Sequence, residues 1–156
     1  MFKPLIQAAL VCGPMILPAL AQAEDRIWSA QQAFDAAARG AVILLDIRTE
    51  EEWRETGVGQ GAWPVSMHVD RFGMDIRRIL AGNPDTPIAL ICATGGRSDY
   101  LARLFRQNNI PNVIDIGEGM MGSGHGPGWL KSGLPVVSAA AALAAMPGDM
   151  IQHVRD

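Results

Sequence analysis

Apolar residues recur along this chain with two different spacings. Short continuous apolar runs, typical of strands buried on both faces of a sheet, occupy residues 41–45, 88–91 and 113–116. Apolar side chains at helical spacing occupy residues 30–39, 71–80 and 98–107. Strands that alternate with helices predict an α/β fold, with a parallel sheet covered by helices on both faces.

Polar residues mark where two of the helices begin. Ser29 is placed to cap the helix at residues 30–39, and Gly40 is placed to end it. Thr49, with Glu52 three residues later, forms a capping-box pattern that predicts a short acidic helix through residue 54.

Two further elements have breaking residues in or beside them. A strand is expected over residues 63–69, away from the centre of a sheet because Pro64 cannot donate a backbone hydrogen bond. Residues 139–145 predict a last helix, which Pro147 and Gly148 end, and a loose tail is expected after them.

The first 23 residues resemble a secretory signal peptide. Lys3 gives a positive start, the run from Leu5 to Leu20 is mostly apolar, and Ala21-Gln22-Ala23 is a cleavage pattern. The run is too short and too interrupted for a membrane-spanning helix. We therefore expect cleavage after Ala23, export to the periplasm and no stable membrane insertion afterwards. The alternatives are an uncleaved anchor or a merely apolar N-terminus.

The balance of charge argues against a nucleic-acid partner. The 156-residue chain has 13 basic residues (Lys and Arg) and 16 acidic residues. Cleavage removes Lys3, which leaves 12 basic against 16 acidic residues and a net charge of −4. Nucleic-acid binding depends on basic surface patches, and an acidic chain is poorly suited to it.

Cys92 is the one cysteine outside the expected signal peptide, because Cys12 lies within it. A lone cysteine forms no internal disulfide and cannot anchor a cysteine-rich metal site, and His68, His125 and His153 lack the spacing of metal ligands. No metal or cofactor is expected. A free thiol is unusual in an oxidising compartment and suggests that the thiol has a function.

A loop of small residues follows Cys92. Ligands of open parallel sheets bind beyond the carboxyl ends of the strands, and Cys92 ends the strand expected at residues 88–91. The next four residues, Ala-Thr-Gly-Gly, allow successive N–H groups to point inward as an anion-binding nest. Arg97 and the start of a helix add positive charge, a setting that stabilises a thiolate. The alternative is a buried, inert cysteine.

Residues 92–98, Cys-Ala-Thr-Gly-Gly-Arg-Ser, resemble the active-site loop of the rhodanese family. Other motifs match the family in the same order along the chain. These are Asp46-Ile47-Arg48 with Glu52-Trp53 and Gly57, the step Gly61-Ala62, Gly117 and Gly119, Trp129, and Gly133-Leu134-Pro135-Val136. The resemblance implies one rhodanese domain at residues 24–137, with residues 138–156 as a C-terminal extension or tail. The implied fold is a five-stranded parallel sheet with helices on both faces.

By this resemblance, Cys92 is the nucleophile of a sulfurtransferase. Its thiolate takes sulfane sulfur from a small donor such as thiosulfate and becomes a persulfide, and cyanide or a thiol then removes the sulfur. The loop residues that bind the substrate are Ala93, Thr94, Gly95, Gly96, Arg97 and Ser98. Asp46 and Arg48 are structural support, an ion pair or a turn brace, rather than catalytic groups. A protein acceptor of the sulfur is possible.

Several other functions remain open. One is a persulfide carrier or binding module that serves a partner protein without turnover. Another is a phosphatase, although cysteine-based phosphatases place five residues between cysteine and arginine, and only four separate Cys92 from Arg97. A redox sensor would need a resolving cysteine. A protease-type pair would need His125, but a histidine in a glycine-rich loop is more often just solvated.

Two departures from the family pattern concern substrate choice and packing. Val58-Gly59 stand where the family often has His-Ile, and residues 121–128 form an insertion that could lie over the active-site mouth. Asp99, just after the loop, is expected to cap its helix rather than to tune Cys92.

Overall fold

The computed structural model describes residues 27–148 and residue 150. The expected signal peptide, residues 1–23, and the end of the expected tail, residues 151–156, lie outside the described residues.

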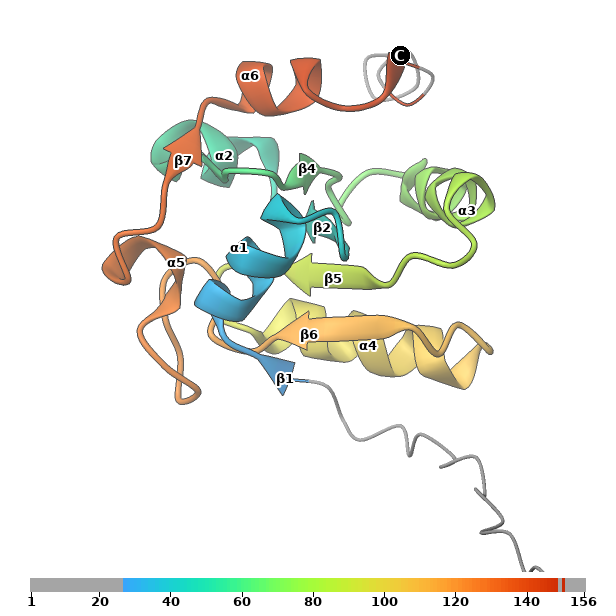
Figure 1. The fold of residues 1–156 in the computed structure, drawn as a ribbon, viewed down its shortest axis with the longest axis horizontal. Helices are drawn as coiled ribbons and strands as arrows, with labels where there is room; N and C mark the ends of the chain where they lie inside the picture. Colours follow the sequence, from blue (N-terminus) through green and yellow to red (C-terminus); the bar gives the residue numbers. More distant parts are fainter. Residues whose placement is uncertain (1–26, 149, 151–156) are drawn as a thin grey trace, which may run out of the picture.

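A five-stranded sheet forms the centre of the fold, in the spatial order β1, β6, β5, β2, β4 (Figure 1). Each neighbouring pair of strands is parallel. The strands are Ile27–Trp28 (β1), Ile43–Asp46 (β2), Trp63–Pro64 (β4), Ile88–Ile91 (β5) and Val113–Ile116 (β6). The α/β class and the five-stranded parallel sheet are therefore confirmed, and β5 and β6 have the predicted ends.

The other strands differ from the prediction. β1 was not predicted, and β2 begins two residues later than expected and includes Asp46. The strand expected over residues 63–69 is only two residues long, because the chain enters turns from residue 67 on its way to the next helix. It lies at the edge of the sheet, where the missing N–H of Pro64 is tolerated.

Helices cover both faces of the sheet, because successive strand residues point to opposite sides. On one face, Leu44, Ile91 and Ile116 pack in one apolar cluster with α1 (Ala30–Ala38) and α5 (Gly128–Lys131). On the other face, Leu45 and Leu90 pack in a second cluster with α3 (Phe72–Gly82) and α4 (Gly96–Gln107).

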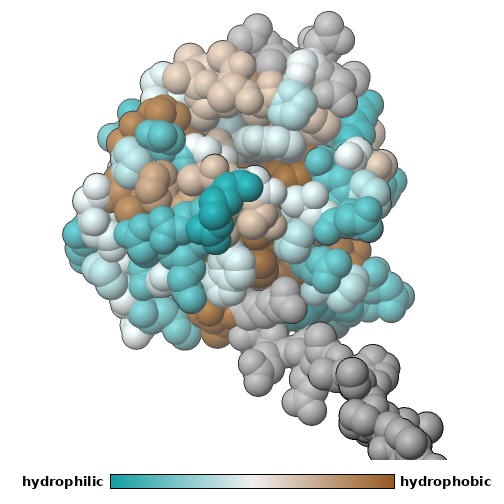
Figure 2. Space-filling view, in the orientation of Figure 1, coloured by the Kyte–Doolittle hydropathy of each residue, from teal (hydrophilic) through white to brown (hydrophobic). Residues whose placement is uncertain are grey.

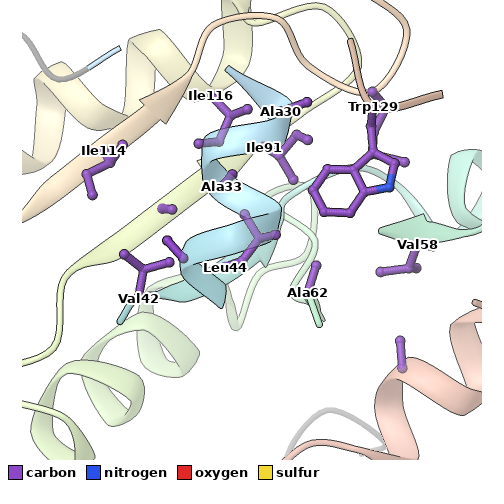
Figure 3. Packing of buried hydrophobic residues seen from close by; sticks show 14 of the residues in the cluster. Ala30, Ala33, Val42, Leu44, Val58, Ala62, Ile91, Ile114, Ile116 and Trp129 are labelled. Carbon is purple, nitrogen blue, oxygen red and sulfur yellow. The ribbon is translucent and has the colours of Figure 1, made fainter. Parts of the chain in front are cut away.

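Small residues let α1 lie close to the sheet (Figure 3). Its buried side chains are Ala30, Ala33 and Ala36, and the predicted cap at Ser29 is present as a full capping box. The fully buried Trp129 of α5 packs beside them, with its ring edge against Phe34 at a centroid distance of 5.7 Å. This contact anchors the segment after β6 against the helix.

A small antiparallel sheet closes the end of the molecule near α5. Its strands are Val58–Gly59 (β3) and Val136–Val137 (β7), and neither was predicted. A β-carbon on Gly59 would lie 2.8 Å from the Trp129 ring, so glycine is required at this position. The departure from the family pattern at Val58-Gly59 is therefore explained by packing.

The described residues beyond Val137 pack against the domain through α6 and two methionines. The predicted helix forms at Ala139–Ala144 (α6), with Ser138 as its cap. Ala142 joins the first apolar cluster, and the buried Met146 and Met150 join the second. The alanines on the outer side of α6 give the pale brown area at the top of Figure 2.

Within residues 27–148 and 150, no helix has the length and apolar character needed to cross a membrane.

Candidate functional site

The predicted site residues gather at the carboxyl edge of the sheet. Cys92 directly follows β5, the middle strand, and is 1% exposed. Asp46 ends β2 and pairs with Ile91 of β5, while Gly117 directly follows β6. Motifs that are far apart in the sequence are therefore neighbours here, at the edge where parallel sheets bind ligands.

The loop after Cys92 is packed tightly against the segment that follows β6. Gly95 has a φ of +87°, and a β-carbon on it would lie 2.2 Å from the carbonyl oxygen of Gly117. The carbonyl groups of Cys92 and Ala93 accept hydrogen bonds of 2.9 and 2.8 Å from the N–H groups of Met120 and Met121. Contacts with the segment after β6 therefore fix the curled shape of the loop.

The backbone of the loop has N–H groups that no other described group uses. The backbone N–H groups of residues 93–97 have no acceptor among the described residues. α4 begins at Gly96, two residues earlier than predicted, so Arg97 and Ser98 lie in its first turn. Free N–H groups at a helix start carry positive partial charge, which favours an anion such as a thiolate or an oxyanion.

The Arg97 side chain is held by Glu52 of α2 (Glu50–Thr56). The Arg97 Nη2 and Nη1 atoms lie 2.5 and 2.8 Å from the two Glu52 carboxylate oxygens. The Glu52 carboxylate raises the pKa of Arg97 above its usual value, and Cys92 adds to the effect. The Arg97 guanidinium in turn lowers the pKa of Glu52 from 4.5 to about 2, with help from the N–H of Thr49. Arg97 is therefore fixed beside Cys92 as a cation.

Asp46 and Arg48 form the predicted ion pair, which is completely buried. The Arg48 Nη2 atom lies 2.7 Å from an Asp46 carboxylate oxygen, and the two side chains are 1% and 0% exposed. Arg48 also donates to the hydroxyl of Thr56 and to the carbonyl of Gly57, each at 2.7 Å. The pair joins the end of β2 to the end of α2, and so supports the helix that carries Glu52.

The insertion at residues 121–128 lies beside the loop. It folds into a turn in which the Ser123 hydroxyl donates to the carbonyl of Gly117 at 2.7 Å. Between the insertion and the loop is a hollow of about 400 Å³, named here the side pocket. Its lining includes Thr94, Gly96, Asp99, Asp115, Ser123 and His125, but not Cys92.

Neither His125 nor Asp99 has the contact that was considered for it. His125 lines the side pocket, which Cys92 does not line, and the Cys92 sulfur lies 3.5 Å from the Ser98 hydroxyl. Asp99 makes no side-chain cap for α4 and pairs with Arg103, one turn along the helix, at 2.8 Å. The expected cap is wrong, because the N-cap residue is Gly95, which has no side chain.

A family model for the rhodanese-like domain matches residues 29–123, more than half of the chain. The chain belongs to this family. The match ends inside the glycine-rich insertion, where the sequence departs from the family pattern.

Individual relatives of this rhodanese-like protein support the fold. An uncharacterised protein of Rickettsia prowazekii is 28% identical over 99 residues, which cover 60% of this chain and 80% of that protein. The polysulfide-sulfur transferase homodimer of Wolinella succinogenes superposes with a TM-score of 0.53 and 20% identity, over 73% of this chain and 80% of that one. A Rhodopseudomonas palustris protein described as a possible tyrosine phosphatase has a TM-score of 0.50 and 21% identity, over 72% and 84% of the two chains. At these identities the two solved structures show the shared fold alone.

Two contacts of this rhodanese-like site were not predicted. Glu52 was expected only to cap its helix, but it also binds Arg97, which is 45 residues away. His68 lies with its Nε2 atom 3.1 Å from Arg97 Nη1, whereas His125 was the histidine expected near the site. In the part of the chain that the structure describes, no group of three His, Cys, Asp or Glu side chains is arranged to hold a metal ion.

Proposed function

We propose that this rhodanese-like protein is a sulfurtransferase in which Cys92 carries sulfane sulfur. The observation that carries the proposal is the loop itself. The Cys92 sulfur lies at the end of the central strand, the N–H groups of residues 93–97 have no acceptor in the described part of the chain, and Arg97 is held near the sulfur. Family membership supports chemistry of the sulfur-transfer type.

The first half of the reaction transfers sulfur to the enzyme. The Cys92 thiolate attacks the outer sulfur of a donor such as thiosulfate. A sulfur–sulfur bond to Cys92 forms, the sulfur–sulfur bond within thiosulfate breaks, and sulfite leaves with the electron pair. In this proposal the N–H groups of residues 93–97 and the cation at Arg97 stabilise the negative charge of the donor and of the persulfide.

The second half regenerates the thiolate. Cyanide or a thiolate attacks the terminal sulfur of the persulfide, and the Cys92 thiolate leaves. With cyanide the product is thiocyanate. Polysulfide, the donor named for the Wolinella succinogenes structure, is the second small donor to test. The persulfide carrier differs from the enzyme in this half only, because its sulfur would leave on a partner protein.

The spacing of the loop favours sulfur over phosphate. Four residues separate Cys92 from Arg97, and the cysteine-based phosphatases place five there. The contacts of Gly95 and Gly119 with neighbouring backbone leave the loop no room to widen, because a β-carbon on either would lie within 2.5 Å of a carbonyl oxygen. We therefore expect no phosphatase activity.

The test measures turnover with both kinds of substrate. The protein without residues 1–23 should form thiocyanate from cyanide with thiosulfate or polysulfide and should release no nitrophenol from p-nitrophenyl phosphate. A Cys92→Ser variant should form no thiocyanate. Phosphate-ester hydrolysis that depends on Cys92, without thiocyanate formation, would refute the proposal.

We further propose that the segment at residues 1–23 exports the protein to the periplasm. The support is the pattern of a basic start, an apolar run and a small-residue cleavage motif. Intact mass of the protein recovered from a periplasmic extract should begin at Glu24, and full-length protein in the membrane fraction would contradict the proposal.

A further inference from the structure

The Ser98 side chain has one hydroxyl hydrogen, and both the Gly95 carbonyl oxygen and the Cys92 sulfur can accept it. Its side chain is fully buried in the first turn of α4. The Ser98 hydroxyl donates to the carbonyl of Gly95 at 3.0 Å, and the Cys92 sulfur lies 3.5 Å from the Ser98 hydroxyl oxygen. A serine hydroxyl has a single hydrogen to donate and two lone pairs that accept. Any other group that hydrogen-bonds to Ser98 therefore changes how often Ser98 donates to the Cys92 sulfur.

Asp115 is the acidic group near Ser98, on the strand next to β5, and it lines the side pocket together with Gly95 and Gly96 of the loop. It belongs to β6, is 3% exposed, and its Oδ1 atom has no hydrogen-bond partner among the described residues. Burial raises the pKa of this carboxyl, and the nearby Ser98 hydroxyl acts in the opposite direction. A buried carboxyl with an unused oxygen is costly, so a role in function is worth seeking.

The charged groups around Asp115 come from two directions. Asp99 of α4 raises its pKa, whereas His125 of the insertion and Arg106 of α4 lower it. Asp115 also lines the side pocket, where His125 and Asp99 lie. The protonation state of Asp115 therefore depends on all three of these charged groups.

We propose that Asp115 is a positioning residue that acts through Ser98 to set how well the Cys92 thiolate is stabilised. The inference rests on the proposed function, because it concerns the same nucleophile. A protonated Asp115 donates to the Ser98 oxygen, and the hydrogen of Ser98 is then directed to the Cys92 thiolate. An ionised Asp115 instead attracts the Ser98 hydrogen away from the sulfur. Cys92 and Asp115 are therefore coupled: a negative charge on either one disfavours a negative charge on the other, because both compete for the same hydroxyl hydrogen.

The experiment measures alkylation of Cys92 by iodoacetamide as a function of pH, since only the thiolate reacts. Asp115→Asn keeps the shape of the side chain and removes its charge. At pH 6 this variant should react about tenfold faster than the wild type, which corresponds to one pH unit in thiolate formation. In a Ser98→Ala background the same substitution should change the rate less than about twofold, because the connecting hydroxyl is gone.

Asp99→Asn is the matched control. It removes a carboxylate that also lines the side pocket but is paired with Arg103, and it should change the alkylation rate by less than about twofold. Equal acceleration by Asp99→Asn and Asp115→Asn would overturn the proposal, because a general charge effect would then explain the result.

The wild-type profile gives a second, variant-free measurement. A lone thiol loses reactivity tenfold for each pH unit on the acid side. Wild-type protein should lose reactivity less steeply where Asp115 takes up its proton, and a strict tenfold slope would refute the coupling. Alkylation needs no sulfur donor. If Asp115 affects alkylation of Cys92 as expected but no thiocyanate forms, only the proposed function is refuted. If thiocyanate forms but Asp115 has no effect on alkylation, only this inference is refuted.

Discussion

Replacing Glu52 by Gln should destabilise the protein in a way that depends on pH. Glu52 binds Arg97 through both carboxylate oxygens, and the pKa of Glu52 falls from 4.5 to about 2 as a result. At ~1.36 kcal/mol for each pKa unit, this difference is worth roughly 3 kcal/mol as an upper limit. The two side chains are 29% and 27% exposed, so solvent screening reduces the expected loss to about 1–2 kcal/mol at pH 7.

The sign of the pH dependence follows from the lowered pKa. A carboxyl whose pKa is lower in the folded state stabilises the fold fully above its unfolded value, here 4.5. That stability disappears as the pH falls through about 2. The difference between wild type and Glu52→Gln should therefore be constant from pH 7 to pH 5 and should shrink below pH 4.5.

Urea unfolding followed by tryptophan fluorescence measures this difference at each pH. Glu51→Gln is the matched control, because Glu51 is an exposed residue on the same helix, and its loss should stay within about 0.5 kcal/mol. A loss that Glu51→Gln shares, or one that stays constant down to pH 3, would refute the role assigned to the pair of Glu52 and Arg97.

Two further substitutions test the support of the site. Arg48→Met leaves the Asp46 carboxylate buried without its cation and should lower the free energy of unfolding, measured with urea, by about 3–5 kcal/mol. A loss below about 1 kcal/mol would contradict the supporting role assigned to this ion pair. Gly95→Ala places a β-carbon 2.2 Å from the carbonyl oxygen of Gly117 and, by displacing the loop, should slow thiocyanate formation about 100-fold. Gly82→Ala, which adds a β-carbon with no neighbour within 4 Å, is its control, and equal rates for the two variants would show that the loop tolerates the change.

The central part of the fold could be predicted because its signals are local. β5 and β6 are continuous apolar runs, so their ends are visible as changes in composition. α1 and α2 begin at capping boxes whose two members are three residues apart. Hydrogen bonds over so few residues leave a clear pattern in the sequence.

The remaining strands could not be predicted because their signals are not local. β1, β3 and β7 are each two residues long, too short to show any periodicity. Each exists because a partner strand lies beside it, and that partner is far away along the chain.

The candidate site likewise has a part with local sequence signals and a part without them. Cys92 and its glycine loop form one continuous segment, and the sequence placed them correctly at the end of the central strand. The contacts of Arg97 with Glu52 and His68 join segments 45 and 29 residues apart, and nothing in the spacing of these residues indicates them. Asp115 lies within an apolar strand, where its burial shows in the pattern but its proximity to Ser98 does not.

The measurement that tests the central claim most directly is the intact mass of the protein during one cycle of sulfur transfer. After thiosulfate, the wild type should gain ~32 Da, the mass of one sulfur as a persulfide, located on Cys92 by peptide mapping. Cyanide should remove that mass with the release of an equal amount of thiocyanate, and Cys92→Ser should show no gain. Absence of any added sulfur on Cys92 after both thiosulfate and polysulfide would contradict the account.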